Sequence, residues 1–180
     1  VGDDRAAYNY SDTNIPKAKD RLEVLDKIKR LEREGRFDID VENDPPTIVL
    51  TPENVDYLNK KETSKIKTKV ANTLGKRFIK EVNGIENLDS VETGAMITCN
   101  HFNPFDSFAI EKTFRMSKQA ENKKLYKVIR EGNYTNFPGF YGFLFRHCDT
   151  LPLSSNKRTM IEFLKAVDTL LKKGEFILIY

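Results

Sequence analysis

The stretch that decides the fold is residues 95–107, which read AMITCNHFNPFDS. It begins with the apolar run Ala95 to Cys99, which is typical of a buried strand. Asn100 and His101 follow, then an Asn-Pro turn, and a helical pattern begins at Ser107. The segment therefore predicts a strand, a polar loop and a helix in succession, with a histidine where the chain leaves the strand.

The same alternation continues on both sides of this segment. Strands are predicted at residues 78–82, 95–99, 125–129, 150–153 and 176–180. Helices are predicted at residues 107–116 and 140–145, and along an apolar stripe from 160 to 171 that Gly174 closes. Strands separated by helices indicate the α/β class, here a mixed, largely buried β-sheet flanked by helices over residues 78–180. Because the apolar strand 176–180 ends without a turn signal, we expect this domain to be truncated at its C-terminus.

Residues 1–77 have a different pattern and are expected to form a helical N-terminal extension. Helical spacing predicts a helix over residues 16–34, and short β-branched runs near 37–41 and 47–50 predict one or two brief strands. Residues 60–81 combine eight lysines and arginines with an apolar residue at every fourth position, Ile66, Val70, Leu74 and Phe78. Such a helix either docks on an anionic membrane surface or packs its apolar stripe on the core, and the two interpretations can coexist.

Composition narrows the possible functions. The chain has 180 residues, 39% of them hydrophobic, and a formal net charge of +3. A core is therefore expected, and the charge is too small to indicate a nucleic-acid partner. No apolar run approaches the roughly 20 residues of a membrane-spanning helix, and residues 1–10 do not resemble a signal peptide. With only two cysteines, a cytoplasmic protein is expected, with peripheral contact at the inner face of the cell membrane as an option.

The only two histidines are His101 and His147. Asp106 lies five residues after His101, across the Asn-Pro turn, and can therefore reach one imidazole nitrogen. The other nitrogen is then a general base for a hydroxyl. The alternative is that Asp106 caps the following helix and His101 is an ordinary loop residue. Cys99 is expected to pack in its strand, and no metal site is expected, because the His147-Cys148-Asp149 run has no partner with ligand spacing elsewhere.

The ordered set of motifs resembles the glycerolipid acyltransferase family, which contains 1-acylglycerol-3-phosphate and glycerol-3-phosphate O-acyltransferases. The family's first signature, Asn-His-x4-Asp after an apolar strand, is matched by Asn100, His101 and Asp106. Upstream, residues 82–88 are similar to the family's Gly-x-Glu-Asn-Leu turn, and downstream residues 138–153 are similar to its second block. The resemblance covers roughly residues 78–180, and the family's third block would begin past Tyr180.

The resemblance implies an acyltransferase in which His101 is the base and Asp106 orients it. The acyl donor would be a thioester, acyl-CoA or acyl-ACP, used as a co-substrate with no bound cofactor, and the acceptor would be a hydroxyl of a glycerol phosphate or lysophospholipid. Where the family usually carries a phosphate-binding arginine, this chain has Ser-Ser-Asn at 154–156. The candidate substrate-binding residues are Asn100, Arg130, Arg146, Lys157 and Arg158.

Two other classes of function remain open on the sequence. The same His101 and Asp106 can activate water, which would give an acyl ester or thioester hydrolase. A basic, non-catalytic module that binds lipid surfaces is the second alternative, because the expected arginine is missing.

Overall fold

The structure, a computed structural model, describes residues 38–40, 47–58, 63–103 and 105–180. The strands are β1 (Asp38–Asp40), β2 (Thr47–Val49), β3 (Ala95–Thr98), β4 (Leu125–Arg130), β5 (Thr150–Leu153) and β6 (Phe176–Ile179). The helices are α2 (Ser64–Phe78), α3 (Ile85–Asp89), α4 (Asp106–Met116), α5 (Glu131–Thr135), α6 (Gly139–His147) and α7 (Lys157–Lys172), with 3₁₀ turns η2 (Pro52–Asn54) and η3 (Lys118–Glu121). The helix predicted over residues 16–34 lies outside the described residues. None of the described helices is long and apolar enough to cross a membrane.

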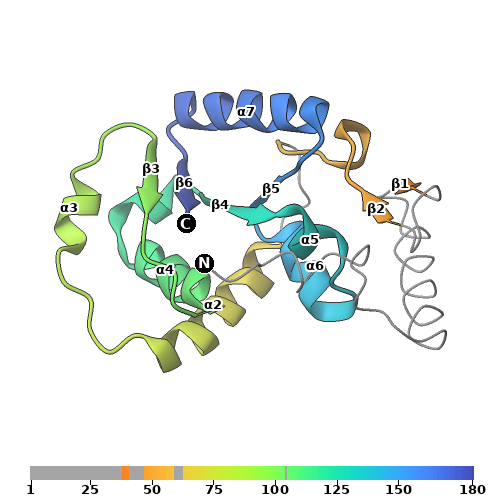
Figure 1. The fold of residues 1–180 in the computed structure, drawn as a ribbon. Coiled ribbons are helices and arrows are strands. Elements are labelled where there is room, and N and C mark those ends of the chain that lie inside the picture. The colour runs from red at the N-terminus through yellow and green to blue at the C-terminus, as the bar shows by residue number, and fades with distance from the viewer. Residues whose placement is uncertain (1–37, 41–46, 59–62, 104) are drawn as a thin grey trace.

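The centre of the fold is a four-stranded parallel sheet in the order β3-β6-β4-β5. The chain moves from β3 to β4 to β5 in one direction and then returns to β6 between β3 and β4. Right-handed crossovers therefore put α4, α5 and α6 on one face and α7 on the other. Figure 1 shows this arrangement, with α7 above the sheet and α2 beside α4 below it. The α/β class is confirmed, and β1 and β2 form a separate antiparallel pair.

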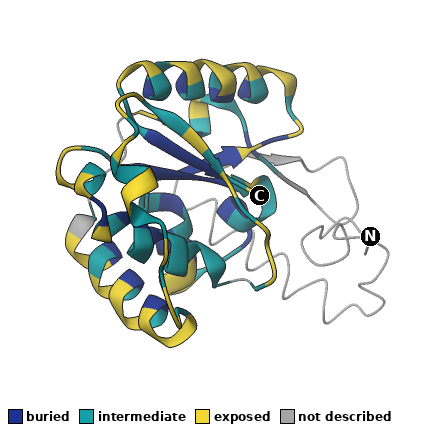
Figure 2. Ribbon diagram, turned by 90° about the vertical axis from the view of Figure 1, so that its left-hand side faces the viewer, coloured by how far each residue is buried: buried dark blue, intermediate teal, exposed yellow. Residues whose placement is uncertain are grey.

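The core consists of two apolar layers, one on each face of the sheet. Figure 2 shows buried strands of the sheet, in dark blue, below the long helix α7. Strand β6 supplies both layers, because Phe176 and Leu178 face α4 while Ile177 faces α7, and all three are fully buried. On the α7 side, Phe163 and Leu170 complete the packing. Burial on both faces favours an apolar residue at every position of β6, which is why this run was predictable as a central strand.

One predicted strand is wrong. Residues 78–82 do not form a strand, since α2 continues to Phe78 and the chain then runs without regular structure to Gly84. The residues have the composition of a strand, but β3 is an edge strand that pairs only with β6 among the described strands. Local propensity without a pairing partner does not make a strand.

Helix α2 lies within the predicted helical segment 60–81, but its most buried side is shifted from the predicted apolar stripe, of which Val70 and Leu74 are partly buried. Lys67, Ala71 and Gly75 are buried, whereas Ile66 and Phe78 at the two ends of the stripe are each 42% exposed. A Cβ added at Gly75 would lie 2.9 Å from the Cβ of Lys112 in α4, so glycine permits this close approach. Part of segment 1–77 therefore packs directly on the α/β unit of residues 78–180, while the division at residue 77 stays a prediction.

Candidate active site

The predicted histidine site lies at the carboxyl edge of the sheet. All four strands of the sheet are parallel, so their carboxyl ends meet at one edge, which is where open α/β sheets bind ligands. The chain leaves β3 at Thr98, passes through the loop that carries His101, and enters α4 at Asp106. The loop is held by Asn103, whose side-chain Oδ1 accepts a hydrogen bond from the backbone N–H of Phe105 at 2.9 Å.

His101 and Asp106 lie side by side, as their spacing predicts. The Nδ1 atom of His101 is 3.3 Å from Oδ2 of Asp106. The same Oδ2 accepts hydrogen bonds from the backbone N–H groups of Phe102 at 2.7 Å and Asn103 at 2.8 Å. The alternative role of Asp106 as a helix cap does not hold, because the N-cap position of α4 is Phe105 and the carboxylate binds residues before the helix.

The electrostatics of the loop keep this carboxylate charged. Burial raises the pKa of Asp106, but the backbone N–H groups of Asn103 and Phe102 and the neighbouring His101 together outweigh burial and lower it. A charged Asp106 favours the tautomer of His101 that carries its proton on Nδ1, which leaves Nε2 able to accept a proton. The side chain of His101 is 49% exposed, so a substrate hydroxyl can reach it.

The predicted substrate-binding residues are dispersed along this edge. Asn100 is exposed immediately before His101, and Arg130 is exposed at the carboxyl end of β4. One strand, β6, separates β3 from β4, so Arg130 lies about 10 Å across the edge from the end of β3. Lys157 and Arg158 begin α7, beyond the far strand β5, and Arg158 forms a 2.8 Å ion pair with Glu53.

Arg146 occupies a different environment from the other candidates. It is buried in α6, and its Nη1 donates to the backbone oxygens of Phe137 at 3.0 Å and Tyr134 at 3.2 Å. The guanidinium therefore joins α6 to the segment that precedes it. Because this role uses the group inside the protein, we do not retain Arg146 as a phosphate ligand.

The other candidate reactive side chains, Cys99 and His147, lie in environments that favour packing and not catalysis. Burial, and then the charge of Asp106, raises the pKa of Cys99, which disfavours the thiolate that a nucleophile needs. The ring of His147 packs on Phe143 with centroids 4.7 Å apart. Within the described ranges, no group of three or more histidine, cysteine or acidic side chains could hold a metal ion.

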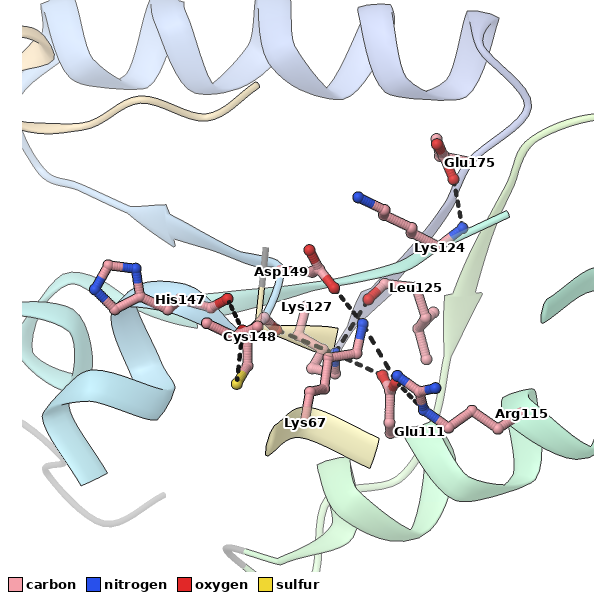
Figure 3. Close-up of polar contacts among 11 residues, drawn as sticks. Lys67, Glu111, Arg115, Lys124, Leu125, Lys127, His147, Cys148, Asp149 and Glu175 are labelled. Carbon is pink, nitrogen blue, oxygen red and sulfur yellow. Dashed lines mark hydrogen bonds and ion pairs between the residues drawn. The ribbon is translucent and has the colours of Figure 1, made fainter. Parts of the chain in front are cut away.

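A buried cluster of charges supports the helix that carries Asp106 (Figure 3). Its members come from α2, α4, β4 and the turn before β5, and they are Lys67, Glu111, Arg115, Lys127 and Asp149. The carboxylate of Glu111 receives Lys127 Nζ at 2.7 Å, Arg115 Nε at 2.8 Å and Lys67 Nζ at 3.3 Å. Lys67 also pairs with Asp149. The cluster thus joins α2 to α4, and both to the sheet.

Sequence reasoning missed this cluster, although one signal for it was present. Lys127 is the middle residue of the predicted strand 125–129, and a lysine in a buried strand requires a partner. Burial lowers the pKa of Lys127, and the charge of Glu111 opposes that effect. The ammonium also donates to the backbone oxygens of Leu125 at 3.1 Å and Cys148 at 3.3 Å. Which residues become these partners depends on tertiary structure. The sequence could therefore indicate that Lys127 requires a partner, but not which residues provide it.

Comparison with known proteins agrees with this geometry. A family model described as Acyltransferase matches residues 80–180, more than half of the 180-residue chain. The matched segment contains the whole parallel sheet, the loop with His101, and Asp106. Comparisons with curated proteins and with solved structures find no match. On the strength of the family match, the chain belongs to the acyltransferase family.

Proposed function

We propose that the protein transfers a fatty acyl group from an acyl thioester to a hydroxyl of a glycerol phosphate or lysophospholipid. The observation that carries the proposal is the His101–Asp106 pair, 3.3 Å apart, inside a segment that matches the acyltransferase family. The donor would be acyl-CoA or acyl-ACP, and the chemistry requires no bound cofactor, because a thiol is a good leaving group. This makes the general base the main catalytic demand on the protein.

The proposed reaction has two steps. Nε2 of His101 takes the proton from the acceptor hydroxyl while the hydroxyl oxygen attacks the thioester carbonyl, and the negative charge of Asp106 stabilises the imidazolium. The tetrahedral intermediate then collapses, the carbon–sulfur bond breaks, and the imidazolium returns its proton to the departing thiolate. General base catalysis of this kind accelerates a reaction by about 10² to 10⁴.

Two groups of residues are candidates for binding the charged parts of the substrates. In the first turn of α4, the N–H groups of Asp106 and Phe108 already donate to the backbone oxygens of Asn103 and Phe105. The N–H of Ser107 is therefore our candidate donor to the oxyanion of the intermediate, because a helix N-terminus favours negative charge. Arg130 is the cation of the predicted set nearest to β3 along the sheet edge, so it is our first candidate for the acceptor phosphate. Lys157 and Arg158 lie one strand further away and are the second candidates.

We also infer that α2 docks the protein on an anionic membrane, at the inner face of the cell membrane. Lys65, Lys69 and Lys76 are exposed on one side of the helix, which contains no acidic residue. The C-terminal end of α2 reaches the histidine loop, where Phe78 stacks on Phe105 with ring centroids 5.3 Å apart. Each lysine near an anionic surface contributes about 1 kcal/mol of attraction.

The transfer reaction is tested with wild type, His101→Ala and the matched control His147→Ala, which removes the only other histidine. Each protein is incubated with lysophosphatidate or glycerol 3-phosphate and an acyl thioester, and products are followed by mass spectrometry. We expect acylated product from wild type and the control and none from His101→Ala. Robust turnover by His101→Ala would refute the mechanism. Free fatty acid without acylated acceptor would favour the hydrolase, and vesicle binding without turnover would favour the lipid-binding module.

Docking is tested separately by sedimentation with vesicles that contain anionic lipid. Reversal of Lys65, Lys69 and Lys76 to Glu should abolish binding, whereas reversal of the exposed Lys165, Lys172 and Lys173, on α7 and directly after it, serves as a charge-matched control. Equal binding by both triple variants would reject α2 as the docking element.

A further inference from the structure

Tyr180 contacts the proposed catalytic base directly. In the register of the sheet, Thr98 in β3 lies opposite Ile179 in β6, so the residues that follow these strands emerge next to one another. The ring of Tyr180 and the imidazole of His101 have centroids 4.4 Å apart and an interplanar angle of 37°. Tyr180 thus covers one side of the imidazole, while Asp106 holds the Nδ1 edge.

The phenol of Tyr180, a residue that is 43% exposed, also contacts the helix that carries Asp106. Burial raises the pKa of Tyr180, the nearby Cys99 and Asp106 raise it further, and a side-chain hydrogen bond with Ser107 opposes them. The hydroxyl therefore stays protonated at neutral pH. Ser107 follows Asp106 in the first turn of α4, so Tyr180 spans from the imidazole of His101 to the helix that carries its carboxylate partner.

We propose that Tyr180 is a positioning residue whose ring holds the imidazole of His101 in the orientation that keeps Nδ1 at Asp106 and presents Nε2 to the acceptor hydroxyl. The role rests on the proposed acyltransferase function. His101 is half exposed, and within the described part of the chain its imidazole has one polar contact, with Asp106 at 3.3 Å. That contact alone leaves the imidazole free to turn. A ring packed against one face removes that freedom before substrate binds, and such preorganisation lowers the barrier of the chemical step.

Three substitutions distinguish the contribution of the aromatic ring of Tyr180 from the contributions of its hydroxyl and of its side-chain volume. Tyr180→Phe keeps the ring, and Tyr180→Leu and Tyr180→Met replace it with aliphatic side chains. We expect kcat to fall about tenfold in the Leu and Met variants, while the KM of donor and acceptor changes less than twofold. In the Phe variant, kcat should stay within twofold of wild type. Because a loss of folded protein would also lower the apparent kcat at unchanged KM, kcat is calculated per folded protein, with the folded fraction of each variant measured by circular dichroism.

A second measurement needs no turnover. Diethyl pyrocarbonate modifies accessible imidazoles, and mass spectrometry of peptides reports His101 and His147 separately. We expect His101 to react several-fold faster in Tyr180→Leu and Tyr180→Met than in wild type or Tyr180→Phe. The rate at His147 should stay the same in every variant, which makes it an internal control for unfolding.

The outcomes distinguish this proposal from the proposed function. If wild type transfers no acyl group, the function fails, and the labelling rates alone decide whether Tyr180 holds the imidazole. Wild-type kcat and labelling in both aliphatic variants would overturn the positioning role. An equal loss of kcat in Tyr180→Phe would also overturn it, because the hydroxyl and not the ring would then be responsible.

Discussion

Glu111→Gln offers the sharpest test of the buried charge cluster, because it removes one negative charge and almost no volume. The side chain is 3% exposed, and its carboxylate lies within 3.3 Å of Lys127, Arg115 and Lys67. Burial raises the pKa of Glu111, but the charges of Lys127 and Lys67 outweigh it and bring the pKa from 4.5 to about 2. That difference corresponds to about 3 kcal/mol of folding free energy at pH 7.

The pH dependence follows from the sign of this effect. The pKa is lower in the folded state, so the unfolded chain binds the proton more tightly and acid favours unfolding. The contribution is fully present above the unfolded value of 4.5 and is lost as the pH falls toward about 2. We therefore expect the stability difference between wild type and Glu111→Gln to be constant near neutral pH and to shrink below pH 4.5.

Urea unfolding followed by circular dichroism at a series of pH values measures both effects. Glu162→Gln is the matched control, because Glu162 pairs with Lys165 at 2.8 Å on the exposed side of α7. An exposed pair contributes at most about 1 kcal/mol, and the control should therefore stay close to wild type. If Glu111→Gln proves as stable as Glu162→Gln at pH 7, the cluster does not stabilise the fold and the argument is refuted.

Three further predictions test other parts of the structure. Cys99→Ala should keep transfer activity in the mass-spectrometric assay, because burial raises the pKa of this thiol and it is not the nucleophile; loss of activity with an unchanged melting temperature would contradict this. Gly75→Val should cost about 1 to 3 kcal/mol in urea unfolding, since even its Cβ would lie 3.1 Å from the backbone oxygen of Phe108. Asn156→Ala should lower the melting temperature by the equivalent of about 1 kcal/mol of stability. The reason is that the Asn156 side chain caps α7 and accepts a hydrogen bond from the N–H of Thr159 at 3.2 Å. An unchanged melting temperature would show that the cap is dispensable.

The parts of the fold and site that were predictable are those determined by residues close together in the sequence. His101 and Asp106 are five residues apart, and a short turn is enough to bring their side chains together. Strand β6 is apolar throughout because both of its faces are covered. The strand predicted over residues 78–82 failed for the opposite reason, since its existence would have needed a partner elsewhere in the chain.

The features that were missed depend on the order of the strands. The contact between Tyr180 and His101 exists because β6 returns to lie beside β3, which no local pattern records. The burial of Lys67 likewise depends on Glu111 and Asp149, which are 44 and 82 residues further along the chain. A periodicity argument assigns lysine to the solvent side of a helix, and for that reason it did not include Lys67 in the packing side of α2.

The packing of α2 also connects the proposed docking surface to the proposed chemistry. Along its length the helix contacts α4 through the Lys67–Glu111 ion pair and the close approach of Gly75, and it contacts the N-cap residue of α4 through the stack of Phe78 on Phe105. Helix α4 begins with Asp106, the partner of the proposed base. A lipid surface that binds the exposed lysines of α2 would therefore fix the orientation of α4 as well. Docking through this helix would then determine which way His101 faces, and would place it near the membrane where a lysophospholipid acceptor is found.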